Sequence, residues 1–121
     1  THYKCCSTFD SSPVTGNLAV GTQALRSPAH DPTLLVLGGQ PSLGRICVAG
    51  TLFASAGAGG ELHRIDRHPT MSLHPVTPMF EADLRRHLGA QGLQDTALVD
   101  LRRLDEDDDA TLAATFDAHL E

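Results

Sequence analysis

The stretch from Arg64 to Phe80 constrains the fold of this chain most strongly, because three prolines fall within it. Each proline removes a backbone donor and fixes φ, so the stretch can form neither a central strand nor a long helix. It also carries two histidines, two arginines, an aspartate and three hydroxyl side chains, without regular spacing. Rigid loops often carry binding groups, so the sequence predicts a polar loop with a binding role.

With 121 residues, the chain fits one domain, and we expect residues 1–121 to form a single unit. Its hydrophobic content of 40% and charged content of 20% are those of an ordinary globular protein. No apolar run is long enough to span a membrane, and no leader peptide is visible, which predicts a cytoplasmic protein without a membrane partner. The acidic excess behind the net charge of −6 lies in residues 100–121. The balanced remainder predicts no nucleic-acid partner.

The three cysteines, Cys5, Cys6 and Cys47, are odd in number and too few for a disulfide scaffold. We therefore expect free thiols, which agrees with a reducing compartment. The sequence starts at Thr1 without an initiating methionine, within an expected strand. From this we expect a fragment of a longer protein.

Segments typical of strands alternate with segments typical of helices. Strands are expected at 2–9, 33–37, 46–53 with an interruption at Gly50, and 96–101; helices at 15–25, at 81–88, and after the acidic run 105–109. Small residues at 54–60 predict a turn. For the helix at 81–88, we expect a cap at Thr77 and an apolar face of Phe80, Leu84 and Leu88. The final helix would present Leu112, Phe116 and Leu120. The alternation predicts an α/β fold, with a mainly parallel sheet between flanking helices in a Rossmann-like three-layer arrangement.

Polar side chains follow the first expected strand, and they include Ser7, Thr8, Asp10 and Ser11. In open parallel sheets, ligands bind beyond the carboxyl ends of the strands, so these groups could hold a polyhydroxylated molecule. An ordinary Asp/Ser turn is the alternative.

Gly39 and Gly44 have the spacing of a phosphate-binding loop, which then requires Lys and Ser/Thr. Arg45 and Ile46 stand there instead, so a nucleotide loop is excluded. Arg45 remains a candidate for binding a carboxylate, with a surface or salt-bridged arginine as the alternative.

Within 64–80, five side chains could donate to an anionic sugar acid: Arg67, His68, Ser72, His74 and Thr77. Alternatively, these groups satisfy one another in a stiff crossover loop. The spacing of His63, His68 and His74 matches no common zinc pattern, and the acidic run lacks the alternation of a calcium loop. No metal site is predicted, and no local signature supports a cysteine nucleophile.

Four segments together resemble the four-carbon acid sugar kinase family, formerly described as a domain of unknown function or a Hrp-dependent type III effector. They are His-Tyr-Lys-Cys-Cys-Ser-Thr-Phe-Asp-Ser-Ser-Pro at 2–13, Pro-Ser-Leu-Gly-Arg at 41–45, Arg-Ile-Asp-Arg-His-Pro-Thr-Met-Ser at 64–72 and His-Pro-Val-Thr-Pro-Met at 74–79. They are collinear over nearly the whole chain. The resemblance departs at Leu73, where relatives tend to carry Arg, and at Phe80, where they tend to carry an acid.

The resemblance implies an ATP-dependent kinase of erythronate- or threonate-like acids, of which this chain is a partial N-terminal, acid-sugar-binding domain. It implies that the Asp-Asp-x-Thr-Gly element lies upstream of Thr1. ATP and Mg²⁺ would belong to a C-terminal domain or subunit, and no cofactor is expected in this chain. The small acid sugar would contact Asp10, Ser11 and Arg45, with residues 74–77 completing the pocket and Asp10 as the candidate base.

Two hypotheses follow. In the first, the chain is the acid-sugar-binding part of such a kinase and is inactive alone. In the second, it is a non-catalytic remnant or one subunit of a split enzyme, which serves as a structural or interaction module; Leu73 and Phe80 motivate it.

Overall fold

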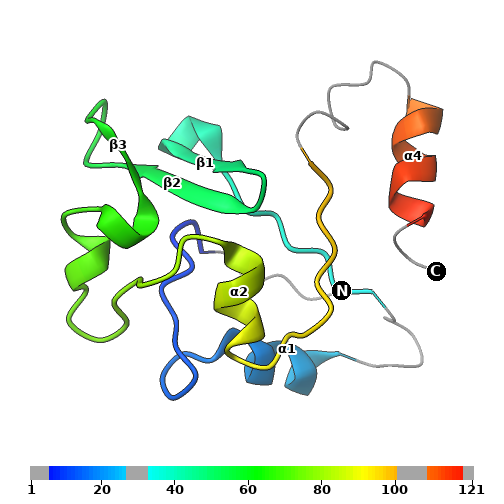
Figure 1. Cartoon of the computed structure of the whole chain (residues 1–121), viewed down its shortest axis with the longest axis horizontal. Helices are drawn as coiled ribbons and strands as arrows, with labels where there is room; N and C mark the ends of the chain where they lie inside the picture. The colour runs from blue at the N-terminus through cyan, green and yellow to red at the C-terminus, as the bar shows by residue number, and fades with distance from the viewer. Residues whose placement is uncertain (1–5, 27–32, 101–108, 119–121) are drawn as a thin grey trace.

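The computed structural model describes residues 6–26, 33–100 and 109–118. A three-stranded antiparallel sheet in the order β1-β2-β3 forms one side of the molecule (Figure 1). Its strands are β1 (Arg45–Val48), β2 (Thr51–Ser55) and β3 (Leu62–Arg64). Arg45 pairs with Ala54, and Ala54 pairs with His63, so these three side chains share one row across the sheet.

The strand expected over 46–53 is instead a hairpin of β1 and β2. Ala49 and Gly50, at φ 49° and 80°, form its turn, because a two-residue hairpin of this twist needs positive φ at both central positions. Asn-Gly is the usual sequence for such a turn. In Ala-Gly only the glycine favours positive φ, so the turn signal in the sequence is weaker. The turn expected over 54–60 begins at residue 56, because β2 continues to Ser55.

Three α-helices lie in the described ranges, together with three single turns of 3₁₀-helix. They are α1 (Leu18–Leu25), α2 (Leu84–Gly89), α4 (Asp109–Asp117), η1 (Pro41–Leu43), η2 (Ile65–Arg67) and η3 (Met71–Leu73). The helices expected at 15–25 and after the acidic run are therefore confirmed. The backbone N–H of Val20 donates to the side chain of Asn17, which caps α1.

The cap predicted for α2 is wrong. Asp83, not Thr77, accepts a hydrogen bond from the backbone N–H of Arg85 at 3.0 Å. Phe80 lies before the helix and is 80% exposed, so of the expected apolar face only Leu84 and Leu88 are buried. Pro78 disfavours a helical conformation at the preceding residue, Thr77, and the helix begins at Leu84, after its cap at Asp83.

The core lies under one face of the sheet. Leu52 and Ala54 alternate along β2 with half-buried neighbours, so their side chains point to the same face. Phe9, Ile65, Met79, Ala82 and Leu84 complete the cluster. The backbone N–H of Leu52 donates to Ala82, and that of Leu84 donates to Gly50, which ties α2 to the hairpin.

The mainly parallel, three-layer sheet is not found in the described part of the chain, where the sheet is antiparallel. Residues 6–9, 33–37 and 96–100 form no strand, although they were expected to supply most of it. The leucines at 35 and 37 are 75% and 80% exposed, so that segment is not buried either. An apolar run becomes a strand only when a neighbouring strand pairs with it, and within the described ranges these segments belong to no strand ladder.

Several expectations lie outside the described residues. These include the start of the first expected strand, residue 101, most of the acidic run, and the side chains of the final helix's apolar face. Helix and sheet coexist in the described part, which agrees with the α/β class. The described helices are too short or too polar to cross a membrane.

Candidate functional site

Asp10 lies in a loop, residues 6–12, that we call the Asp10 loop. Its Oδ1 accepts hydrogen bonds from Thr8 Oγ1 at 2.5 Å and from Cys6 Sγ at 3.5 Å. Asp10, Thr8 and Ser7 are all half-buried. Its other oxygen, Oδ2, receives no side-chain hydrogen bond from the described residues. One carboxylate oxygen is thus fixed, and the other is left to accept a hydrogen bond from a ligand.

The pKa of Asp10 is lowered from its ordinary value. Burial alone would raise this pKa, but the hydrogen bonds from Thr8, from its own backbone and from Cys6, together with the electrostatic influence of His74, outweigh it. The carboxylate is therefore ionised at neutral pH and can accept a hydrogen bond from a sugar hydroxyl.

His74 belongs to the second of two His-Pro turns, residues 74–79, and is half-buried. Its Nδ1 accepts hydrogen bonds from the backbone N–H of Thr77 at 3.0 Å and of Val76 at 3.4 Å. A nitrogen that accepts two such bonds carries no proton, so this network assigns the proton to Nε2. Because His74 acts on the pKa of Asp10, the structure brings these two predicted site residues together.

A buried polar clamp fastens the Asp10 loop to α2. Ser11 Oγ donates to the carbonyl of Phe9 at 2.7 Å and lies 2.9 Å from His87 Nε2. His87 Nε2 also contacts the Phe9 carbonyl at 3.1 Å, and Gln91 Nε2 donates to Ser11 Oγ at 2.8 Å. Phe9 has a left-handed backbone, φ 57°, which is unfavourable for a bulky residue unless neighbours hold it. Ser11, predicted to contact substrate, therefore has its hydroxyl bonded inside the protein.

Burial lowers the pKa of His87 below its ordinary value, against the opposing effects of its bond to Phe9 and of Glu81. Sequence reasoning missed His87 and Gln91. Both follow Leu84 at helical spacing, at i+3 and i+7, on the same stripe as Leu88. Polar side chains within an apolar stripe were the signal that could have found them.

The first His-Pro turn, residues 68–73, contains two more predicted groups, His68 and Ser72, and Arg67 directly precedes it. Nδ1 of the buried His68 accepts from the backbone N–H of Thr70 and Met71 at 3.1 and 3.2 Å, and its Nε2 contacts the Ser55 carbonyl at 3.3 Å. His68 Nε2 is therefore the donor to that carbonyl, and both ring nitrogens are used. Arg67 is exposed, and Ser72 Oγ donates to the His68 carbonyl.

Arg45 is the β1 member of the row Arg45, Ala54 and His63 across the sheet. It lines a hollow of about 340 Å³ that we call the Arg45 pocket. Its Nη1 donates to the Leu43 carbonyl at 2.6 Å. Arg45 and the Asp10 loop border the same core, because Ala54, which pairs with Arg45, and Phe9 belong to one buried cluster. The predicted groups thus form two sites around that core, one at Asp10 and His74 and one at Arg45.

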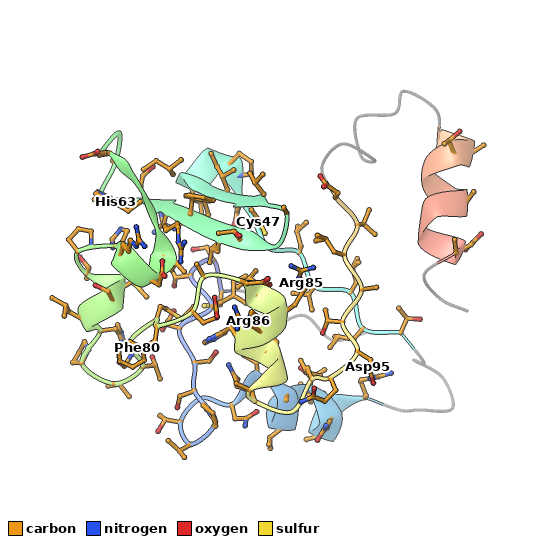
Figure 2. All side chains as sticks on the ribbon, in the orientation of Figure 1. Cys47, His63, Phe80, Arg85, Arg86 and Asp95 are labelled. Atoms are coloured by element: carbon orange, nitrogen blue, oxygen red, sulfur yellow. The ribbon has the colours of Figure 1, made fainter. Side chains whose placement is uncertain are left out.

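A larger, open hollow of about 600 Å³ lies between α2 and residues 93–96 and contains none of the predicted site residues. Arg85, Arg86 and Asp95 line this hollow, and Figure 2 shows the two arginines on α2 and Asp95 on the segment that follows the helix. Arg85 is engaged with Asp83 at 2.7 Å, which leaves little free charge for a ligand.

The described residues do not fit a nucleotide with its metal ion. In those ranges, no three His, Cys, Asp or Glu side chains gather in a way that could hold a metal. Gly39 to Gly44 leads through the 3₁₀ turn η1 into a strand, whereas a phosphate-binding loop opens a helix.

The family described as "Sugar-binding N-terminal domain" matches residues 1–121. A 3-oxo-isoapionate kinase of Paraburkholderia graminis is 45% identical over 111 residues, which is 90% of this chain and 23% of that protein. A 3-oxo-tetronate kinase of Methylobacterium radiotolerans is 34% identical over 96% of this chain and 25% of its own length. The chain therefore spans about a quarter of the curated relatives that it matches.

A crystal structure of a Haemophilus influenzae protein, from the family DUF1537, is similar to the fold described above. The TM-score is 0.76 at 29% identity, over 95% of this chain and 26% of that protein.

Proposed function

We propose that this chain, which belongs to the family of sugar-binding N-terminal domains, is the substrate-binding part of a cytoplasmic kinase that phosphorylates a 3-oxo sugar acid. The relatives' names support this substrate class, because each denotes a carboxylate with an oxo group at carbon 3. This class refines the erythronate- or threonate-like acids expected from the sequence. In this proposal, the kinase is the longer protein that contains the chain. A parallel sheet would have to form with residues of that protein outside the described part of the chain.

The ionised, half-buried carboxylate of Asp10 carries the proposal. Its Oδ1 is held by Thr8 and Cys6, which aims the remaining oxygen and prevents the group from turning away. A carboxylate in this state can orient a substrate hydroxyl and take its proton as the hydroxyl attacks a phosphoryl group. His74 Nε2–H can donate to an oxygen of the same substrate. Thr77, which is buried, acts through His74 by holding its ring.

The other predicted groups have supporting roles in this proposal. Ser11 fixes the loop through the clamp, and His68 builds the turn that precedes His74. Arg67 and Ser7 are accessible enough to reach a ligand at the rim. ATP and Mg²⁺ would be bound by the nucleotide-binding domain or subunit, outside this chain.

The test is a kinase assay on the full-length parent protein with 3-oxo-tetronate, and with D-erythronate and L-threonate for comparison. Asp10→Asn should lower kcat/KM by roughly 100-fold or more, because an amide cannot accept the proton. Asp95→Asn is the matched control: Asp95 is exposed, and asparagine tolerates its positive φ of 58°. The site assignment is wrong if Asp10→Asn and Arg45→Ala both leave affinity and rate unchanged.

The second hypothesis, a structural or interaction module, is favoured by one observation. Leu73 and Phe80 are 78% and 80% exposed where the resemblance to the kinase family departs. A split enzyme would regain kinase activity when this chain is combined with a separately encoded nucleotide-binding half. Combination with such halves that never yields activity would favour the remnant.

A further inference from the structure

Gln91, two residues after α2, joins three separate segments of the chain at one buried point. Its Oε1 accepts a hydrogen bond from the backbone N–H of Leu18, the first residue of α1, at 2.8 Å. Its Nε2 donates to Ser11 Oγ in the Asp10 loop at 2.8 Å and lies 3.0 Å from His87 Nε2 on α2. The amide accepts on one side and donates on the other, so the start of α1 fixes which atom faces the Asp10 loop.

His87 holds the Asp10 loop from the side of α2. Its Nε2 lies 3.1 Å from the Phe9 carbonyl and 2.9 Å from Ser11 Oγ. A carbonyl oxygen can only accept, so the bond to Phe9 assigns a proton to Nε2. The same carbonyl accepts from the Ser11 hydroxyl at 2.7 Å, and it therefore has two donors. Both bonds act on the residue directly before Asp10.

Asp10 thus lies between two residues that the clamp holds in place. Ser11 and Phe9 are 2% and 9% exposed, whereas Asp10 is half-buried and can reach a ligand. Phe9 has φ 57°, a conformation that a bulky residue keeps only where its surroundings hold it. Without the bonds from His87 and Ser11, the backbone at Phe9 would be free to return to negative φ, and the Asp10 side chain would turn with it.

We propose that His87 and Gln91 are positioning residues for the kinase reaction. Through Ser11 and Phe9, they hold the Asp10 carboxylate where it meets the substrate hydroxyl. The inference rests on the proposed function and deepens it, because it gives two residues that do not touch the substrate a part in the rate. A displacement of about 1 Å at a catalytic group can lower a rate by roughly 100-fold, so a clamp at this distance from the ligand can control catalysis.

The first test is a kinase assay on the full-length parent protein with 3-oxo-tetronate. His87→Leu removes the Nε2 donor and keeps an apolar side chain in the buried site. It should lower kcat by roughly 10- to 100-fold and change KM by less than about threefold, because the base is displaced while the donor of His74 stays in place. His87→Gln should recover most of the rate, since its amide N–H can reach the place of the ring Nε2–H.

A double-mutant cycle with Asp10→Asn separates positioning from a general structural role. In the Asp10→Asn background, His87→Leu should lower kcat by less than about twofold, because the group that His87 positions can no longer take a proton. A residue that serves only the fold would lower kcat by the same factor in both backgrounds. That result would overturn the inference.

A second variant keeps the test decisive if His87→Leu does not fold. Gln91→Met keeps nearly the length of the side chain but removes both amide bonds, and it should lower kcat by roughly 3- to 30-fold. Gln94→Met is the matched control, since Gln94 is exposed and donates to the Gly89 carbonyl at 2.8 Å. It should leave kcat within about twofold of the wild type.

The inference and the proposed function fail in different ways. If Asp10→Asn lowers kcat but folded His87→Leu and Gln91→Met do not, the clamp has no positioning role and the proposed function stands. If the wild-type parent phosphorylates no 3-oxo sugar acid, or if Asp10→Asn leaves its rate unchanged, the proposed function itself is refuted before the clamp variants are compared.

Discussion

The two His-Pro turns, 68–73 and 74–79, share one local design but leave their histidines in different states. In each, the proline lacks a donor, and ring Nδ1 accepts from the N–H groups two and three residues after the histidine. The turns are also joined, because the backbone N–H of Met79 donates to Met71 at 2.9 Å. His68 is buried with Nε2 on the Ser55 carbonyl, whereas His74 is half-buried beside Asp10.

This difference shows that burial separates a histidine that serves the fold from one that is available to a ligand. The His-Pro motif alone cannot make this distinction, because in both turns ring Nδ1 accepts from the same two backbone positions. What decides is whether the second ring nitrogen bonds to a backbone carbonyl, as in His68, or makes no hydrogen bond with the described residues, as in His74. Three predictions test this, in order of decreasing effect on stability.

His68→Ala should lower the free energy of unfolding by about 2–4 kcal/mol, because it leaves the N–H groups of Thr70 and Met71 and the Ser55 carbonyl unpaired and opens a cavity. Denaturant unfolding of the parent protein, followed by a probe in this domain, measures the loss. His68→Asn is the informative partner, since an asparagine oxygen can accept from the same two N–H groups. It should recover part of the stability, and equal losses in the two variants would argue against the capping role of Nδ1.

A third histidine, His87, extends the comparison to pH. Its pKa is lowered by burial, so the unfolded state binds the proton more tightly than the folded state does. Its contribution to stability is complete above the ordinary value of 6.5 and is lost as the pH falls below it, by at most about 1.4 kcal/mol per pH unit. Asp10, whose pKa is lowered from 3.8, loses its contribution only at more acidic pH.

Unfolding measured between pH 7.5 and 5 checks this prediction, with His87→Gln as the variant in which the slope should diminish. A wild-type stability that is flat over this range would contradict the assignment of a neutral, buried His87.

His74→Asn should change the free energy of unfolding by only about 0.5 kcal/mol or less, because an Asx turn can replace the ring's role. Binding of the 3-oxo sugar acid should nevertheless weaken roughly 10-fold, since the ring's Nε2–H donor is lost. Isothermal titration of the parent protein separates the two effects. A large loss of stability without a loss of affinity would place His74 in the same class as His68.

Local signals in the sequence predicted the helices better than the sheet. The spacing of Leu84 and Leu88 predicted α2, and the helix expected at 15–25 is found as α1, although its cap at Asn17 was not predicted. A helix satisfies its hydrogen bonds within itself, so nearby residues determine it. Residues 33–37 read as a buried strand because they are apolar, but a strand depends on distant partners that local sequence does not specify.

The candidate site shows the same division. His74 is close enough to Asp10 to lower its pKa, whereas the pocket predicted between residues 7–12 and 74–77 stays a prediction. The roles of His87 and Gln91 could not be predicted, because each depends on contacts between segments far apart in the chain. Such contacts follow from packing rather than from spacing.

The exposed leucines of residues 33–37 have a practical consequence for work on the isolated chain. This apolar segment belongs to no strand ladder of the described residues, and such a segment is a template on which a second molecule can add a strand. The apparent molar mass of the isolated chain, measured by light scattering, should therefore rise with concentration. Lysine at 35 and 37, where the side chains already face solvent, should suppress this self-association without disturbing the core.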